Sequence, residues 1–150
     1  MRRLFAVKGL PHSGKGKTVR LVLSKLLDEF PDAEKILCQP SAKSKDVCAV
    51  LSIDGTRIGF ESNNHPKDLT EKSLKLFSKK RCDVIICATL TTGHTVEAFR
   101  NRFADRKITW IDLLKPASMS AREKACRAKA DEIFDEVRAI LIGKRKLTAE

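Results

Sequence analysis

The sequence of 150 residues contains no tyrosine and one tryptophan, so the side chains that stack on exposed nucleic-acid bases are scarce. It has no apolar stretch approaching the roughly 20 residues that a helix needs to cross a bilayer. Near the N-terminus, Lys8 interrupts the apolar run too early for a signal peptide. We therefore expect a cytoplasmic protein with no membrane partner.

Cysteine and histidine also occur in patterns that exclude common structural sites. The five cysteines form no C-x-x-C pair, and the three histidines are not in zinc-ligand spacing with them. Most of the cysteines lie in apolar runs, which favours buried, reduced thiols. They are Cys38, Cys48, Cys82, Cys87 and Cys126.

Positive charge dominates the chain. The formal net charge is +11, which indicates anionic partners such as nucleotides, nucleic acid or an acidic surface. A charged, soluble surface without such a partner is the alternative. Hydrophobic residues make up 42% of the chain, enough for one packed domain, which we assign to residues 1–143. Residues 144–150 form a basic C-terminal tail, which we expect to be frayed.

Hydrophobic patterning predicts alternating strands and helices. Strands are expected at 3–7, 83–88 and 107–114, and amphipathic helices at 19–30, 96–103 and 120–143. Ser120 and Glu123 have the spacing of a capping box at the start of the last helix. This order predicts an α/β fold with three αβα layers and a mostly parallel sheet. A hairpin should add one antiparallel strand at an edge of that sheet.

The hairpin is predicted by Asp54-Gly55, a two-residue turn between two β-rich runs. Pairing about this turn places Ile53 opposite Thr56, Leu51 opposite Ile58 and Ala49 opposite Phe60. Alternation then gives the hairpin one apolar face.

The stretch from Gly9 to Lys15, GLPHSGK, matches G-x-x-x-x-G-K between a predicted strand and a predicted helix. The glycines allow the backbone to curl with its N–H groups facing inward, and the helix start adds unpaired donors and partial positive charge. Lys15 is expected to reach the terminal phosphates as a mobile cation. A chance glycine-rich turn is the alternative interpretation.

On these residues the chain resembles the P-loop NTPases, and GLPHSGKGK is most similar to their nucleotide-kinase branch, such as the adenylate kinases. The resemblance covers about the first thirty residues and implies binding of a nucleoside triphosphate, expected to be ATP, with Mg²⁺. The Ser or Thr that usually follows the lysine is replaced by Gly16, and a second register would use Gly16-Lys17-Thr18 as G-K-T. The residues that the resemblance assigns to the phosphates are Gly9, His12, Ser13, Gly14, Lys15, Gly16, Lys17 and Thr18.

Ligands of open α/β sheets bind beyond the carboxyl ends of the parallel strands. Glu61 ends a strand expected to run parallel to the first, so it is the candidate carboxylate for Mg²⁺; an ordinary surface glutamate is the alternative. His94, in the loop after strand 83–88, is the candidate general acid or base. That loop also fits a simple helix cap. Asp112 faces either the site or a helix layer.

Two motifs are missing. Strand 83–88 ends in Ala88-Thr89 without the acid of the second NTPase motif, and no N-K-x-D stretch supports guanine recognition. Arg100, Arg102 and Arg106 are the arginines expected nearest the active edge. The functional hypotheses are a small Mg²⁺-dependent phosphotransferase or NTP hydrolase, a nucleotide-binding switch with little turnover, and a basic nucleic-acid-binding module. The second substrate stays unknown, and weak electrostatic binding of nucleic acid is expected from the charge.

Overall fold

The computed structural model describes residues 2–9, 13–40, 47–62, 75–90, 105–113 and 118–149, with the side chains at 37–40, 90 and 144–149 left aside. Its centre is a six-stranded mixed sheet in the order β2-β3-β4-β5-β1-β6. The strands are β1 (Arg3–Gly9), β2 (Glu34–Pro40), β3 (Val47–Ile53), β4 (Thr56–Glu61), β5 (Val84–Leu90) and β6 (Lys107–Leu113). The two long helices are α1 (Lys15–Glu29) and α4 (Met119–Ala149).

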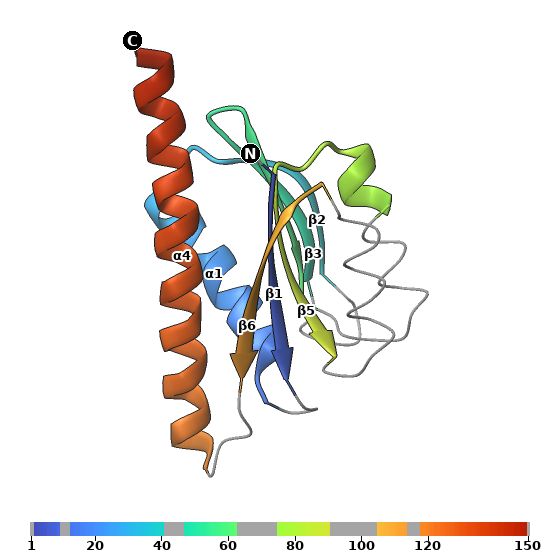
Figure 1. Cartoon of the computed structure of the whole chain (residues 1–150), viewed down its shortest axis with the longest axis vertical. Coiled ribbons are helices and arrows are strands. Elements are labelled where there is room, and N and C mark those ends of the chain that lie inside the picture. Colours follow the sequence, from blue (N-terminus) through green and yellow to red (C-terminus); the bar gives the residue numbers. More distant parts are fainter. Residues whose placement is uncertain are drawn as a thin grey trace.

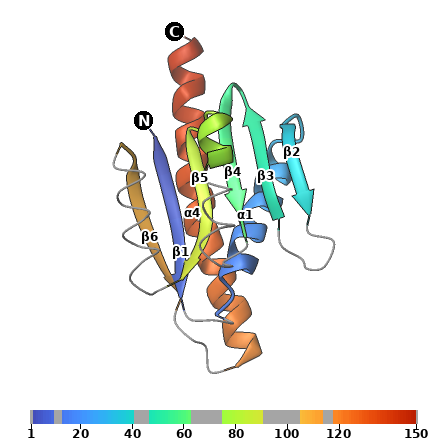
Figure 2. The same ribbon diagram turned by 90° about the vertical axis from the view of Figure 1, so that its right-hand side faces the viewer.

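The sheet is parallel over β4, β5, β1 and β6, which confirms the predicted α/β class and the predominance of parallel pairing. Strand β3 runs antiparallel to both of its neighbours (Figure 2). The prediction that the hairpin places an antiparallel strand at an edge was wrong, because β2 pairs with the outer side of β3 and takes the edge position.

The hairpin has the predicted register: Ile53 pairs with Thr56, Leu51 with Ile58, and Ala49 with Phe60. Asp54 and Gly55 both have positive φ, at 50° and 81°, as a tight two-residue turn of this kind requires. Strand β4 therefore leaves the turn parallel to β5 and carries Glu61 to the same edge of the sheet at which β1 ends.

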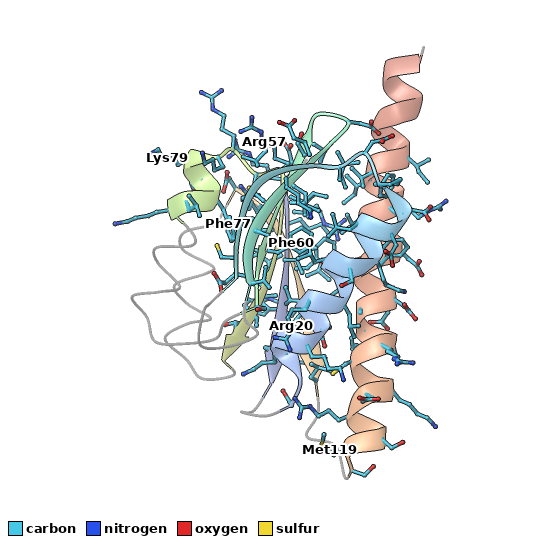
Figure 3. The ribbon with its side chains drawn as sticks, turned by 180° about the vertical axis from the view of Figure 1, so that it is seen from behind. Arg20, Arg57, Phe60, Phe77, Lys79 and Met119 are labelled. Atoms are coloured by element: carbon cyan, nitrogen blue, oxygen red, sulfur yellow. The ribbon has the colours of Figure 1, made fainter. Side chains whose placement is uncertain are left out.

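Helices α1 and α4 cover one face of the sheet, and a helical segment at 75–79 lies on the other (Figure 1). The larger apolar cluster lies under α1 and α4 and includes Phe60, whereas Phe77 of the 75–79 segment belongs to a second cluster on the opposite face (Figure 3). Alternation along each strand explains the two clusters, since odd and even positions point to opposite faces.

Helix α4 differs from its predicted boundaries at both ends. Its start is capped by Ser118, whose Oγ accepts a hydrogen bond from the Ala121 N–H, rather than by the predicted Ser120 and Glu123 pair. The helix continues through Gly143 to Ala149, although an end near Gly143 was predicted. Three ion pairs join α1 to α4: Lys17–Glu123, Lys25–Asp131 and Glu29–Arg138.

The described residues bear on two expectations from composition, those on the cysteines and on membrane-spanning helices. Cys48, Cys82, Cys87 and Cys126 are free thiols, and all but Cys48 are buried. Among the described residues, no helix is both long and apolar enough to span a membrane.

Candidate functional site

The glycine-rich segment joins the end of β1 to the start of α1, at the centre of the parallel part of the sheet. Strand β1 ends at Gly9, and α1 begins at Lys15 with Gly14 as its N-cap residue. Leu10, Pro11 and His12 lie outside the described residues. The segment therefore leaves the carboxyl end of a strand that is flanked on both sides by parallel neighbours, where open α/β sheets bind ligands.

Both glycines of the motif have a structural requirement. Gly14 has φ of +98°, and a Cβ atom there would lie 2.4 Å from the Sγ atom of Cys126. At Gly9, a Cβ atom would lie 2.6 Å from Ser13 Oγ and 2.8 Å from the carbonyl oxygen of Leu113. The close approach of the backbone to its neighbours thus excludes a side chain at either position.

Lys15 is buried, with only 3% of its surface exposed, and its Nζ atom donates a hydrogen bond to the carbonyl oxygen of Gly9 at 2.8 Å. The side chain therefore reaches back across the loop rather than along α1. Burial lowers the pKa of the Lys15 ammonium, because removal from water disfavours its charge. A phosphate at the loop would compensate this burial with opposite charge.

Ser13 precedes the helix and is 1% exposed. Its Oγ atom is buried and has no hydrogen-bond partner within the described ranges. A buried hydroxyl without a partner loses its hydration without compensation, at a cost of about 1–3 kcal/mol. A ligand oxygen at the loop would satisfy this hydroxyl, so Ser13 favours a bound anion independently of the helix start.

The next residues of α1 differ in their environment. Thr18 is fully buried, and both its N–H and its Oγ1 donate to the carbonyl oxygen of Gly14. The Thr18 hydroxyl thus supports the loop from inside the helix, and its contact with a phosphate stays a prediction. Lys17 is partly exposed and pairs with Glu123 at 2.9 Å. The first turn of α1 contains no acidic residue to oppose an anion.

Three further polar residues lie at the same edge. Glu61 ends β4 and is 8% exposed, Ser62 follows it, and Thr89 lies near the end of β5. Glu61 pairs in register with Cys87 of β5. Burial, and then the charge of Glu61, raise the pKa of the Cys87 thiol, so this thiol stays protonated. Ser62 fixes the strand end, because its Oγ accepts a hydrogen bond from the Val47 N–H at 2.7 Å.

Glu61 is the buried carboxylate at this edge that could help to hold a metal ion. The described residues include no group of three or more His, Cys, Asp or Glu side chains placed to hold a metal. Mg²⁺ commonly keeps several waters and takes one or two carboxylates together with substrate phosphates. Glu61 could supply such a carboxylate. Gly16 has no hydroxyl, and that of Thr18 is directed to Gly14.

Asp112 was left open by the sequence, and the structure places it on the face of the sheet opposite α1. It is exposed and forms an ion pair with Lys8 at 3.4 Å, next to Gly9 of the loop. Lys8 also lies over the Trp110 ring, with Nζ 5.5 Å from the ring centroid. Asp112 therefore orients a cation beside the loop instead of entering the helix layer.

Arg106, another candidate, does not join these residues. Arg106 precedes β6, at the amino ends of the parallel strands, where it donates to the carbonyl oxygens of Cys82 and Asp83. The prediction that it lies near the carboxyl ends of these strands was therefore wrong. His94, Arg100 and Arg102 fall outside the described residues, as does His12.

Cys126 and Arg122 of α4 were missed by the sequence reasoning, although both approach Gly14. Cys126 Sγ lies 3.4 Å from the Gly14 carbonyl oxygen, and a Cβ atom on Gly14 would lie 3.2 Å from Arg122 Nε. The apolar spacing of Cys126, Ala130, Ile133 and Val137 indicates the buried stripe of α4. Nothing local indicates that the first residue of this stripe meets the loop.

Comparisons with protein-family models, with curated protein sequences and with solved structures found no match.

Proposed function

We propose that the chain is a P-loop protein that binds the phosphate chain of a nucleoside triphosphate, taken as ATP, together with Mg²⁺. The observation that carries this proposal is the geometry at the two ends of the loop. A parallel strand ends at Gly9, the left-handed Gly14 precedes the helix, and the buried Lys15 ammonium donates a hydrogen bond back to the Gly9 carbonyl oxygen.

The alternative, a structural glycine-rich turn, explains less. A turn needs the conformational freedom of Gly14, but it does not need a buried cation. Nor does it need the buried hydroxyl of Ser13, which lacks a partner among the described residues. Phosphate oxygens would accept from Lys15, from Ser13 and from the first N–H groups of α1, so one ligand accounts for all three features.

In this proposal Glu61, the carboxylate at the end of β4, would hold Mg²⁺ or its waters. The metal would neutralise phosphate charge. Lys15 would bind and orient the terminal phosphates, and the loop N–H groups would fix their position. His94 remains the candidate general acid or base.

We propose phosphoryl transfer or hydrolysis as the reaction class, with a nucleotide switch of little turnover as the alternative. A turnover assay with Mg²⁺ and ATP or GTP, alone and with a panel of nucleoside monophosphates, separates them. Multiple turnovers that Lys15→Ala abolishes support the enzyme. Saturable binding without turnover supports the switch, and absence of binding contradicts both.

A further inference from the structure

A cavity of about 500 Å³ lies between the amino-terminal half of α1 and the start of α4, near the glycine-rich loop. This volume falls within the roughly 300–1,000 Å³ typical of small-molecule sites. Figure 3 shows Arg20 on α1 and Met119 at the start of α4 near the same end of the two helices. The cavity is lined by Lys17, Arg20, Leu21, Ser24, Met119, Arg122 and Glu123.

The lining is cationic. Lys17, Arg20 and Arg122 face one carboxylate, Glu123, and the capped amino end of α4 adds partial positive charge. The α1 residues occupy positions 17, 20, 21 and 24, which form one stripe about 10 Å long at 1.5 Å per residue. The positive charges thus follow a groove rather than being scattered over the surface.

Arg122 contributes a guanidinium to this lining and lies beside Gly14 of the loop. Its Nε atom is buried and lacks a hydrogen-bond partner in the part of the chain that the structure describes. A phosphate group offers several acceptor oxygens to a guanidinium, and such charged hydrogen bonds are among the strongest in proteins. The lining contains no aromatic side chain on which a ring could stack.

We propose that this α1–α4 groove binds a second phosphate-bearing small molecule, distinct from the nucleotide phosphates at the loop. The residues that line the groove come from α1 and α4, not from the loop. Calling its ligand a second one rests on the proposed function, which places the first at the loop. Lys17 belongs to this groove, because its side chain points to α4 and bonds Glu123.

Glu123 competes with an anionic ligand for a cation of the groove. Its carboxylate is exposed, and the hydrogen bond from Lys17 lowers the pKa of this carboxyl. Glu123 therefore stays charged and keeps its ion pair with the Lys17 ammonium. An incoming phosphate must replace Glu123 at this ammonium. Removing the carboxylate charge should therefore strengthen phosphate binding.

The test is calorimetric titration of the full chain with inorganic pyrophosphate, which carries the phosphate chemistry of both sites without a base. Wild type should show two sites. Lys15→Ala should remove the loop site and keep the groove site. Arg122→Gln should weaken the groove site by about tenfold or more, the effect of losing a charged hydrogen bond, and Glu123→Gln should tighten it. Lys124→Gln is the matched control, because this exposed neighbour on α4 does not line the cavity.

The outcomes separate the two proposals. Loss of all binding in Lys15→Ala, with Arg122→Gln unchanged, overturns the groove and leaves the proposed function standing. Retention of a site that Arg122→Gln weakens, with no effect of Lys15→Ala on any site, supports the groove and contradicts the loop. A single site lost in both variants means that the groove only extends the loop site, which also overturns this inference. Thermal unfolding of each variant checks its fold, and Arg20→Gln replaces Arg122→Gln if the latter does not fold.

Discussion

The Sγ atom of Cys126 lies 3.4 Å from the carbonyl oxygen of Gly14, although 112 residues separate them in the sequence. The same carbonyl accepts hydrogen bonds from the N–H and the Oγ1 of Thr18. The left-handed residue at the start of α1 is therefore held from two sides, by its own helix and by α4. The position of Gly14 therefore depends on the packing of α4 as well as on the local sequence.

Gly14→Ala should destabilise the protein by about 2–4 kcal/mol, from the left-handed backbone and the collision with Cys126. Urea denaturation measures the free energy of unfolding. Gly143→Ala is the control, because no atom lies within 4 Å of a Cβ there and the residue is inside α4. That substitution should stabilise by up to about 1 kcal/mol. Equal effects of the two would contradict the assigned role of Gly14.

ATP binding should take up protons at alkaline pH. Burial lowers the pKa of Lys15 in the free protein, so its charge is lost at a lower pH than for an exposed lysine. Bound phosphates favour the charged form and raise this pKa. Affinity should therefore fall as pH rises through the pKa of the free protein.

Calorimetry in two buffers of different ionisation enthalpy, near neutral pH and about two units higher, measures this proton uptake. In Lys15→Arg the uptake should vanish, because a guanidinium stays charged throughout this range. Uptake of the same size in wild type and Lys15→Arg would assign it to another group.

Glu61→Gln should weaken Mg²⁺-dependent ATP binding more than metal-free binding. The substitution keeps the shape of the side chain and removes the charge that holds Mg²⁺ or its waters. Titrations with and without Mg²⁺ measure the difference. Asp54→Asn, at the opposite edge of the sheet, is the matched control and should change neither. Unaltered Mg²⁺ dependence in Glu61→Gln would make Glu61 an ordinary strand-end residue.

Nucleic acid should bind at low salt and should not compete with ATP. Lys79, Lys80 and Arg81 precede β5, at the end of the sheet away from the loop, and α4 carries 143–146 toward that same end (Figure 1). Exposed charges are screened over roughly 8 Å at physiological salt, so binding should fade near 150 mM.

Titration of fluorescent duplex and single-stranded DNA at several salt concentrations tests this expectation. Each neutralised phosphate contributes about −0.9 to the slope of log K against log salt concentration on duplex DNA. A surface that binds DNA specifically through several phosphates should therefore give a slope steeper than about −4. Sub-micromolar binding at physiological salt that ATP displaces would contradict the expectation.

The sequence predicted those parts of the fold that depend on local patterns. Asp54-Gly55 determined the hairpin register, and the direction of the second hairpin strand then placed Glu61 at the edge where β1 ends. The order of the strands in the sheet was harder to predict, because the short β2 has no periodic pattern that reveals its pairing with β3. The end of α4 was misjudged because a single glycine, Gly143, is a weak stop signal inside a helix.

The candidate site shows the same division. The motif from Gly9 to Lys15 was visible because its chemistry is contiguous in the chain. The contributions of Cys126 and Arg122 were not, because they arise from the packing of two helices that are distant in sequence. Glu123 was predicted to cap its own helix, but Lys17 of α1 competes for the same carboxylate and forms the pair.

Nucleotide binding at the loop, with Lys15 as the phosphate-binding lysine, is tested most directly by the effect of ATP on thermal unfolding. The proteins to compare are wild type, Lys15→Ala and Lys17→Ala. A ligand that binds only the folded state raises the melting temperature with its concentration. We predict a saturable rise in wild type, the loss of most of that rise in Lys15→Ala without loss of the fold, and retention of most of it in Lys17→Ala, because Lys17 pairs with Glu123 outside the loop. Loss in Lys17→Ala with retention in Lys15→Ala would contradict the register, and no rise in wild type would contradict nucleotide binding itself.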